Sequence, residues 1–353
     1  MDQETQPRKI FIGGTGRSGT TILSEVLSSH PRVYTFTQEL RFHIDPYGLL
    51  PLHRALTRDY SPPVARQAWL DFLDLMQNKL CAPLPPPYIG FNLKKTFGRD
   101  FYFDQISALE EQLIYTTWTG NNYHMSASSM DRNLAWLYRF IERVGNIAIR
   151  YALRSHYSRG KRIWLAPSHT IRDTKFFEDE NQLALVLGTF FDNLLSARAG
   201  AEGCDVWCEH TPGNAINASF LASMLPNSCL IYTHRNPWSL ALSYRRRSWA
   251  PKSLEDVCQV LQFLFRKWQF ERCKLEEIGY SFLEVALEDL TSGSDEAMKS
   301  ICNLIGIDFN FSKFEILDKH RHSLSQTEMS KEDVTVLERY FPNQSVPMYT
   351  LEK

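Results

Sequence analysis

The sequence predicts an α/β fold in which a parallel sheet is flanked by helices, with a mostly helical insertion at residues 45–170. A short apolar run at 9–13 leads through a glycine-rich turn into an amphipathic stretch at 20–29. This order is typical of a strand, a phosphate-binding loop and a helix. Apolar runs typical of buried parallel strands recur later, at residues 205–209, 228–234 and 281–286.

The composition is that of an ordinary globular protein. Lys and Arg number 39 against 40 Asp and Glu, a net charge of −1, which gives no support to a nucleic-acid-binding protein. No apolar run reaches about 18 residues, so we expect no membrane span. The seven cysteines do not indicate a disulfide framework. Because no apolar signal segment opens the sequence, we expect a cytoplasmic protein. No long linker interrupts the sequence, and we expect one domain over residues 1–353.

The insertion at 45–170 differs in texture from the rest of the chain. Amphipathic segments lie around 64–80, 103–117 and 131–153, with aromatic residues recurring among them. Such periodicity predicts helices packed over the α/β core. Two interpretations stay open: a plain helical subdomain, or a cap that binds a substrate. Further helices are expected near 295–305 and 330–341.

The glycine-rich turn has the spacing of a nucleotide-binding P-loop. Gly14 and Gly19 are followed by Thr20 and Thr21, where a P-loop NTPase has lysine and then serine or threonine. The nearby cation is instead Arg17. Without the lysine that reaches the outer phosphates, a shorter anion without magnesium is favoured. The alternative is a glycine turn without a ligand. The candidate anion-binding residues are Gly16, Arg17, Ser18, Gly19, Thr20 and Thr21.

A second anion-binding pattern follows the run at 228–234. Arg235 stands at its end, and Pro237 suits the first turn of a helix. Ser243 lies eight residues after Arg235, a little over two helical turns, and Arg247 one turn further. An arginine can bind a phosphate through two parallel hydrogen bonds, and a serine hydroxyl can add a third. The alternative is a solvated arginine-rich helix.

Together the two motifs resemble those of the sulfotransferases that use 3′-phosphoadenosine 5′-phosphosulfate (PAPS). Gly16–Leu23 is similar to their loop for the 5′-phosphosulfate, and Arg235 with Ser243 is similar to their 3′-phosphate motif. Leu287–Leu290 resembles their Tyr-Glu-Asp-Leu segment, with leucine replacing tyrosine. Glu209–Pro212 resembles a Glu-Lys-Thr-Pro segment, with histidine replacing lysine. The resemblance covers the first 45 residues and about 205–305.

The resemblance implies a P-loop-NTPase-like fold and sulfuryl transfer from PAPS to an acceptor hydroxyl or, less readily, an amine. It implies that Arg17 and the loop hold the 5′-phosphosulfate and that Arg17 stabilises its leaving oxygen. Arg235, Ser243 and Arg247 would hold the 3′-phosphate, and no metal is required. The acceptor would be a small molecule, a lipid or a glycan, bound through the insertion.

The resemblance also implies a general base. Glu39 matches the glutamate assigned this role in protein-tyrosine and glycan sulfotransferases, and Arg41 completes the Glu-x-Arg of the tyrosine-directed members. A structural salt bridge between Glu39 and Arg41 is the alternative. Cytosolic small-molecule sulfotransferases use a histidine, so His43 and His169 stay as further candidates near the acceptor.

Other patterns are weaker. A P-loop kinase or nucleotide hydrolase is disfavoured by Thr20, and a non-catalytic nucleotide-binding protein is disfavoured by Glu39. The Cys204 and Cys208 pair has no second pair at zinc-site spacing, so we expect no metal. The basic cluster at 319–322 either closes over a nucleotide or is an exposed loop. The oligomeric state cannot be read from these patterns.

Overall fold

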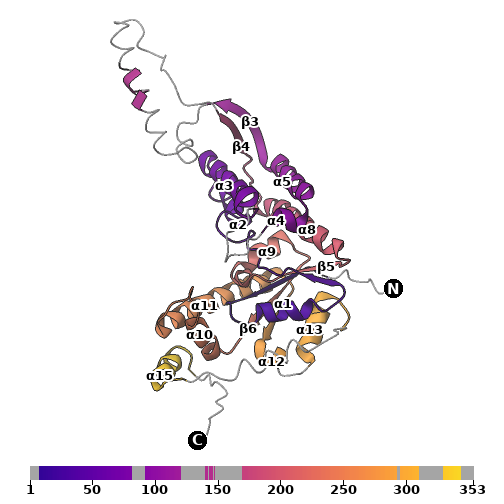
Figure 1. Ribbon diagram of the computed structural model, residues 1–353, viewed down its shortest axis with the longest axis vertical. Coiled ribbons are helices and arrows are strands. Elements are labelled where there is room, and N and C mark those ends of the chain that lie inside the picture. Colours follow the sequence, from indigo (N-terminus) through magenta and orange to yellow (C-terminus); the bar gives the residue numbers. More distant parts are fainter. Residues whose placement is uncertain are drawn as a thin grey trace.

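The predicted α/β fold is confirmed: a five-stranded parallel sheet flanked by helices forms the lower part of the protein (Figure 1). The computed structural model describes residues 8–81, 92–120, 169–291, 295–309 and 329–342, with a few positions between 140 and 147. The strand order is β2-β5-β1-β6-β7, and every neighbouring pair is parallel. The strands are β1 (Ile10–Gly14), β2 (Val33–Thr35), β5 (Val206–Glu209), β6 (Cys229–His234) and β7 (Phe282–Ala286).

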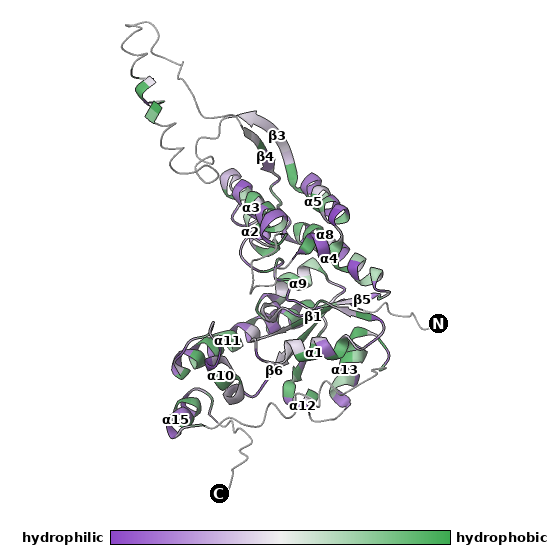
Figure 2. Ribbon diagram, viewed as in Figure 1, coloured by the Kyte–Doolittle hydropathy of each residue, from purple (hydrophilic) through white to green (hydrophobic). Residues whose placement is uncertain are grey.

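Helices cover both faces of the sheet, as the continuous apolar runs of the strands require. On one face Ile10 and Ile12 of β1 pack against α1 (Thr20–Leu27) and α13 (Glu296–Ile305). On the other face Phe11 belongs to a larger core with α8 (Glu180–Ala201), α9 (Ala218–Met224) and α11 (Leu254–Ile278). Figure 2 shows that β1 and α13 are largely hydrophobic. Because all strands run the same way, the segments that follow them meet at one edge of the sheet.

The region predicted as a helical insertion contains helices and one ribbon that was not predicted. The helices are α2 (Leu49–Leu56), α3 (Pro62–Asp74) with the π-helical turn η1 (Leu75–Lys79), α4 (Leu93–Phe97) and α5 (Arg99–Leu113). They share the Phe11 core. The antiparallel strands β3 (Ile114–Gly120) and β4 (His169–Thr174) extend beyond them (Figure 1). The segment at 131–153 lies outside the described residues, apart from the positions between 140 and 147.

The ribbon corrects one boundary. The amphipathic segment expected at 103–117 is helical only to Leu113, because Ile114, Tyr115, Thr116 and Thr117 are β-branched or aromatic residues that favour a strand. Most of β3 is exposed, and Figure 2 shows the ribbon as mainly polar.

The last described helix, α15 (Lys331–Tyr340), packs on α10 (Pro237–Arg245) and α11. Arg245 of α10 donates to both carboxylate oxygens of Asp333, at 2.6 and 3.0 Å. The indole Nε1 of Trp238 donates to the carbonyl of Phe341 at 3.1 Å. Therefore α15 holds both ends of α10. The basic cluster at 319–322 lies outside the described residues.

Two short elements complete the edge of the sheet: the 3₁₀ helix η2 (Pro212–Asn217) after β5, and α12 (Leu287–Thr291) after β7. A Cβ on Gly13 of β1 would lie 2.5 Å from the backbone nitrogen of Ala215, so η2 is packed directly on β1. Within the described part of the chain, no helix combines the length and the apolar character needed to cross a bilayer.

Candidate active site at the carboxyl edge of the sheet

The phosphate loop connects β1 to α1, and left-handed residues shape it. Gly16 and Arg17 have φ values of 78° and 56°, and Gly19 has a φ of 103°. Successive residues of this kind bring backbone N–H groups to one side of a turn. Glycine adopts this conformation without strain, whereas Arg17 does so at some cost, as is common at functional sites. A Cβ on Gly19 would lie 2.7 Å from Leu287 Cδ1, so α12 packs against the loop.

The side chains of the loop divide into internal and external groups. Ser18 is buried, and its Oγ lies 3.2 Å from Thr233 Oγ1, which in turn donates to the carbonyl of Gly13 at 3.2 Å. Ser18 therefore anchors the loop to β6 through its hydroxyl. Thr20 is buried at the start of α1, whereas Arg17 and Thr21 are exposed. Arg17 is thus the charged side chain that the loop presents to solvent.

The start of α10 places Arg235 beside the loop. Asn236 is the N-cap, and its side chain accepts from the backbone nitrogens of Trp238 and Ser239 at 3.0 and 3.2 Å. The backbone nitrogen of Asn236 donates to Glu288 Oε1 of α12 at 2.9 Å. This capped start fixes the direction of α10, so that Arg235 stands at the end of β6 and Ser243 lies two turns along the helix.

The structure brings the two predicted anion-binding motifs together. Arg17 Nε donates to Ser243 Oγ at 3.3 Å, across 226 positions of sequence. The hydroxyl of Tyr244 donates to the carbonyl of Thr15, which ties α10 to the loop a second time. The loop and α10 therefore form one continuous surface, although the two motifs lie more than two hundred residues apart in the sequence.

Arginine side chains repel one another in this surface. Partial burial lowers the pKa of Arg17, and the positive charge of Arg247 lowers it further. Burial likewise lowers the pKa of Arg235; Glu288 opposes this effect, and Arg17 adds to it. Guanidinium groups stay protonated in proteins. The charges of Arg247 and Arg235 therefore both lie close to that of Arg17, and an anion with several negative charges would relieve the repulsion in this region.

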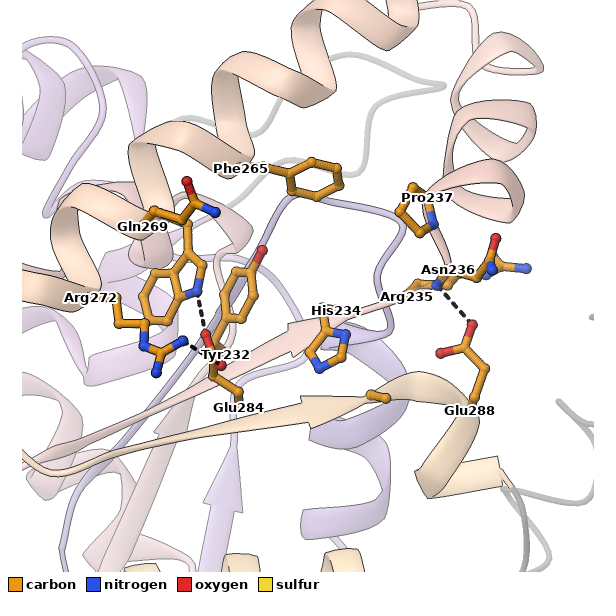
Figure 3. A pocket seen from close by; sticks show the side chains of 12 residues that line it. Tyr232, His234, Arg235, Asn236, Pro237, Phe265, Gln269, Arg272, Glu284 and Glu288 are labelled. Carbon is orange, nitrogen blue, oxygen red and sulfur yellow. Dashed lines mark hydrogen bonds and ion pairs between the residues drawn. The ribbon is translucent and has the colours of Figure 1, made fainter. Parts of the chain in front are cut away.

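A pocket of about 590 Å³ borders Arg235 on the α11 side of the sheet. Tyr232 of β6 and Trp268 of α11 stack there with their ring centroids 4.1 Å apart. Trp268 Nε1 donates to Glu284 Oε1 of β7 at 2.6 Å. Figure 3 shows the Tyr232 and His234 side chains between α11 and the ends of β6 and β7. The sequence motifs did not predict this pocket; the available signal was the alternation that puts residues 232, 234, 284 and 286 on one sheet face.

Glu39 lies in the segment that follows β2 and is paired with Arg41. Arg41 Nη1 donates to Glu39 Oε2 at 3.0 Å, while its Nε and Nη2 donate to Asp45 at 2.7 and 3.2 Å. The hydrogen bonds that Arg41 donates to Asp45 are the main cause of the raised pKa of Arg41. The Glu39 side chain remains 33 % exposed. The salt bridge considered as the alternative is thus present, and it leaves the carboxylate reachable from solvent.

The two candidate histidines lie elsewhere. His43 is fully buried, with Phe11, Phe42 and Phe191 around its ring, and its Nε2 is 2.7 Å from Asn214 Oδ1. His169 begins β4 in the ribbon, paired with Gly120. The structure therefore places neither histidine in the surface formed by the loop and α10.

In the sequence Glu209 stood out only as part of a resemblance, but the structure gives it a central place. Its carboxylate is fully buried at the end of β5, next to β1, and accepts hydrogen bonds from Leu40, Thr211 and Asn214. Burial alone would raise the pKa of Glu209, but His43 and the hydrogen bonds outweigh it and lower that pKa. The signal for this residue in the sequence was a charged side chain at the end of an otherwise apolar strand. The neighbouring His210 is buried beside α1, with Nδ1 3.4 Å from Ser24 Oγ.

These motifs agree with comparisons to known proteins. A model of the sulfotransferase family matches residues 7–78 and 130–311, well over half of the chain. The protein is a member of the sulfotransferase family. No curated protein is similar enough to count as a match.

Solved sulfotransferase structures align over nearly the whole chain at low identity. The sulfotransferase domain of the olefin synthase from Synechococcus PCC 7002 is 12 % identical, with 99 % of this chain and 92 % of that one covered and a TM-score of 0.42. Sulfotransferase STF1 from Mycobacterium tuberculosis H37Rv is 13 % identical, with 95 % and 77 % covered and a TM-score of 0.40. Sulfotransferase STF9 from Mycobacterium avium is 13 % identical, with 95 % of this chain and 75 % of that one covered and a TM-score of 0.37. The family assignment therefore rests on the family match.

Proposed function

We propose that this sulfotransferase moves a sulfuryl group from PAPS to an acceptor hydroxyl or, less readily, an amine. The observation that carries the proposal is the contact between Arg17 and Ser243, which joins the phosphate loop to α10. A ligand with two anionic groups suits one continuous surface that carries Arg17, Arg235 and Arg247. PAPS has such groups at its 5′ and 3′ positions.

The loop would bind the 5′-phosphosulfate and the start of α10 the 3′-phosphate. Arg17, the loop N–H groups and the hydroxyls of Thr20 and Thr21 would stabilise the charge that develops on the departing phosphate oxygen. Arg235 and Arg247 would bind the 3′-phosphate, with Ser243 donating a third hydrogen bond. In this arrangement arginines and backbone dipoles supply the positive field.

Glu39 would act as the general base. It would accept the acceptor's proton as the acceptor oxygen attacks sulfur and the bond between sulfur and the bridging phosphate oxygen breaks. Exposure of the carboxylate and its pairing with Arg41 support this role, because the pair orients the group without burying it. The burial of His43 and the position of His169 in the ribbon support a glutamate over a histidine.

The acceptor would be a small molecule, a lipid or a glycan, and we propose that the region at 45–170 caps its site. The helix α2 begins ten residues after Glu39, at Leu49, and the helices that follow share the core of the sheet. A cap built into this core would hold the acceptor at a fixed distance from the base.

Thermal shift tests the donor. Ligand at a hundred times its Kd adds about 2.7 kcal/mol to the free energy of unfolding. We expect 3′,5′-bisphosphoadenosine to raise the Tm by several degrees without magnesium. Stabilisation by Mg-ATP alone would favour a kinase and contradict the proposal. Screening acceptor libraries in the presence of PAPS would then identify the acceptor class.

The 3′-phosphate assignment predicts a selective loss in Arg235→Ala. Binding of bisphosphoadenosine should weaken by about 1.5–3 kcal/mol, the usual range for a hydrogen bond to a charged group. Binding of adenosine 5′-phosphosulfate, which has no 3′-phosphate, should barely change. Calorimetry measures both affinities. Arg58→Ala is the control, because Arg58 is an exposed arginine paired with Glu180 and should affect neither ligand. Equal losses for both nucleotides in Arg235→Ala would remove the assignment.

A further inference from the structure

Glu209 is a buried carboxylate with a full set of donors at the end of β5. Oε1 accepts from the backbone nitrogens of Leu40 and Thr211 at 3.0 and 3.1 Å and from the Thr211 hydroxyl. Oε2 accepts from Asn214 Nδ2 at 2.7 Å. A buried charge with this many charge-assisted hydrogen bonds is held rigidly, because each lost bond would leave a desolvated group unpaired.

One of these bonds reaches the proposed base. The nitrogen of Leu40 belongs to the peptide bond that directly follows Glu39, and Glu209 accepts from it. The segment has no regular structure between β2 and α2, and Arg41 within it has a left-handed φ of 58°. The bond from Leu40 to Glu209 is therefore one of the contacts that tie the backbone beside Glu39 to the sheet.

A second link starts from His43 on the same segment. Its Nε2 lies 2.7 Å from Asn214 Oδ1, and Asn214 uses its Nδ2 for both Glu209 and the carbonyl of Ile12, the latter at 3.0 Å. The nitrogen of Asn214 is thus committed as a donor, so His43 Nε2 carries the proton in its bond to Oδ1. Ile12 lies on β1, two residues before Gly14 and the phosphate loop.

The cluster of Glu209, Asn214 and His43 therefore connects the segment that carries Glu39 to the strand that carries the phosphate loop. We propose that Glu209 is a positioning residue: its carboxylate holds the peptide bond after Glu39 and so sets where the base stands relative to the bound donor. The inference rests on the proposed role of Glu39. Misplacing a catalytic group by about 1 Å can cost about 100-fold in rate.

The principal test is Glu209→Gln, which keeps the size of the side chain and replaces one accepting oxygen by a donor. We expect kcat to fall by about 10- to 100-fold, with the affinity for bisphosphoadenosine within about threefold of wild type. The chain offers a matched control in Glu271 of α11, which is also buried, accepts the backbone nitrogen of Ser219 at 2.8 Å and pairs with Lys267. Glu271→Gln should lose a comparable amount of stability and keep its kcat.

Two readouts separate positioning from a purely structural role. If Glu209 acts through Glu39, the double variant Glu39→Gln/Glu209→Gln should turn over no more slowly than Glu39→Gln alone. If the loss of kcat in the double variant equals the product of the losses in the two single variants, the inference is overturned. Amide hydrogen exchange should accelerate at Leu40 in Glu209→Gln and at Ser219 in Glu271→Gln. Unchanged protection of Leu40 would also overturn it.

A further variant covers the case in which Glu209→Gln fails to fold. Glu209→Asp keeps the charge beside His43 but withdraws the carboxylate from Leu40 by one methylene, and it should show the same loss of kcat and the same exchange at Leu40. Failure of the proposed function has a different signature: no variant or wild type transfers sulfuryl, while Leu40 still loses protection when Glu209 is changed. A normal turnover in Glu39→Gln would overturn both roles.

Discussion

Glu39→Gln should lower kcat by about 10²–10⁴-fold, the usual contribution of a general base. Glutamine keeps the size of the side chain and one oxygen that can accept from Arg41 Nη1, so the segment should keep its conformation. Folding and affinity for bisphosphoadenosine should stay close to wild type. The loss should be largest for an alkyl alcohol, whose proton is hard to remove, and smaller for an acidic phenol. Steady-state rates with both acceptor types measure this difference.

The protein contains a control for the charge change itself. Glu180 forms an exposed pair with Arg58, much as Glu39 does with Arg41, and Glu180→Gln should leave kcat unchanged. The opposite pattern would assign the base to a histidine: near-normal turnover in Glu39→Gln, with activity abolished in His43→Ala or His169→Ala.

Arg17→Ala should lower kcat more than it raises KM for the donor. An arginine that stabilises charge on the leaving oxygen acts mainly in the transition state, and loss of one such donor costs about 10²–10³-fold in kcat. Arg17→Lys should recover part of the rate, since it restores a point charge without the planar fork. Single-turnover kinetics can separate chemistry from donor binding. If only KM changes, Arg17 is a binding group and the leaving oxygen is stabilised by other residues.

The parts of the fold that were predictable from the sequence are those with local signals. The glycine spacing and the flanking apolar runs predicted β1, the phosphate loop and α1, because a strand, a tight turn and a helix each have short-range patterns. Arg235 and Ser243 were predictable as a pair, because the turn after β6 carries Arg235 and leads directly into α10, which carries Ser243. The start of β3 was predicted as helix, because its apolar positions continue the pattern of α5 until β-branched residues take over.

The arrangement of the candidate site depends on long-range contacts that no local pattern contains. The bond between Arg17 and Ser243 requires β1 and β6 to be neighbours, which only the sheet order decides. The buried cluster around Glu209 draws on segments that follow β2 and β5 and on a carbonyl of β1. His43 was a candidate catalytic histidine in the sequence, but three aromatic rings enclose it in the structure. Phe42 is its neighbour in the sequence, whereas Phe11 and Phe191 are distant.

The packing of α15 on α10 affects when the candidate site can fold during translation. The phosphate loop is synthesised early, and β6 with Arg235 must follow before the two anion-binding motifs can meet. Even then α10 lacks two contacts, because residues 331–341 are synthesised later still. These are the bond from Arg245 to Asp333 and the bond from the Trp238 indole to the carbonyl of Phe341. Domains generally acquire their fold as units during translation. A nascent sulfotransferase should therefore gain full affinity for its donor only after α15 has left the ribosome.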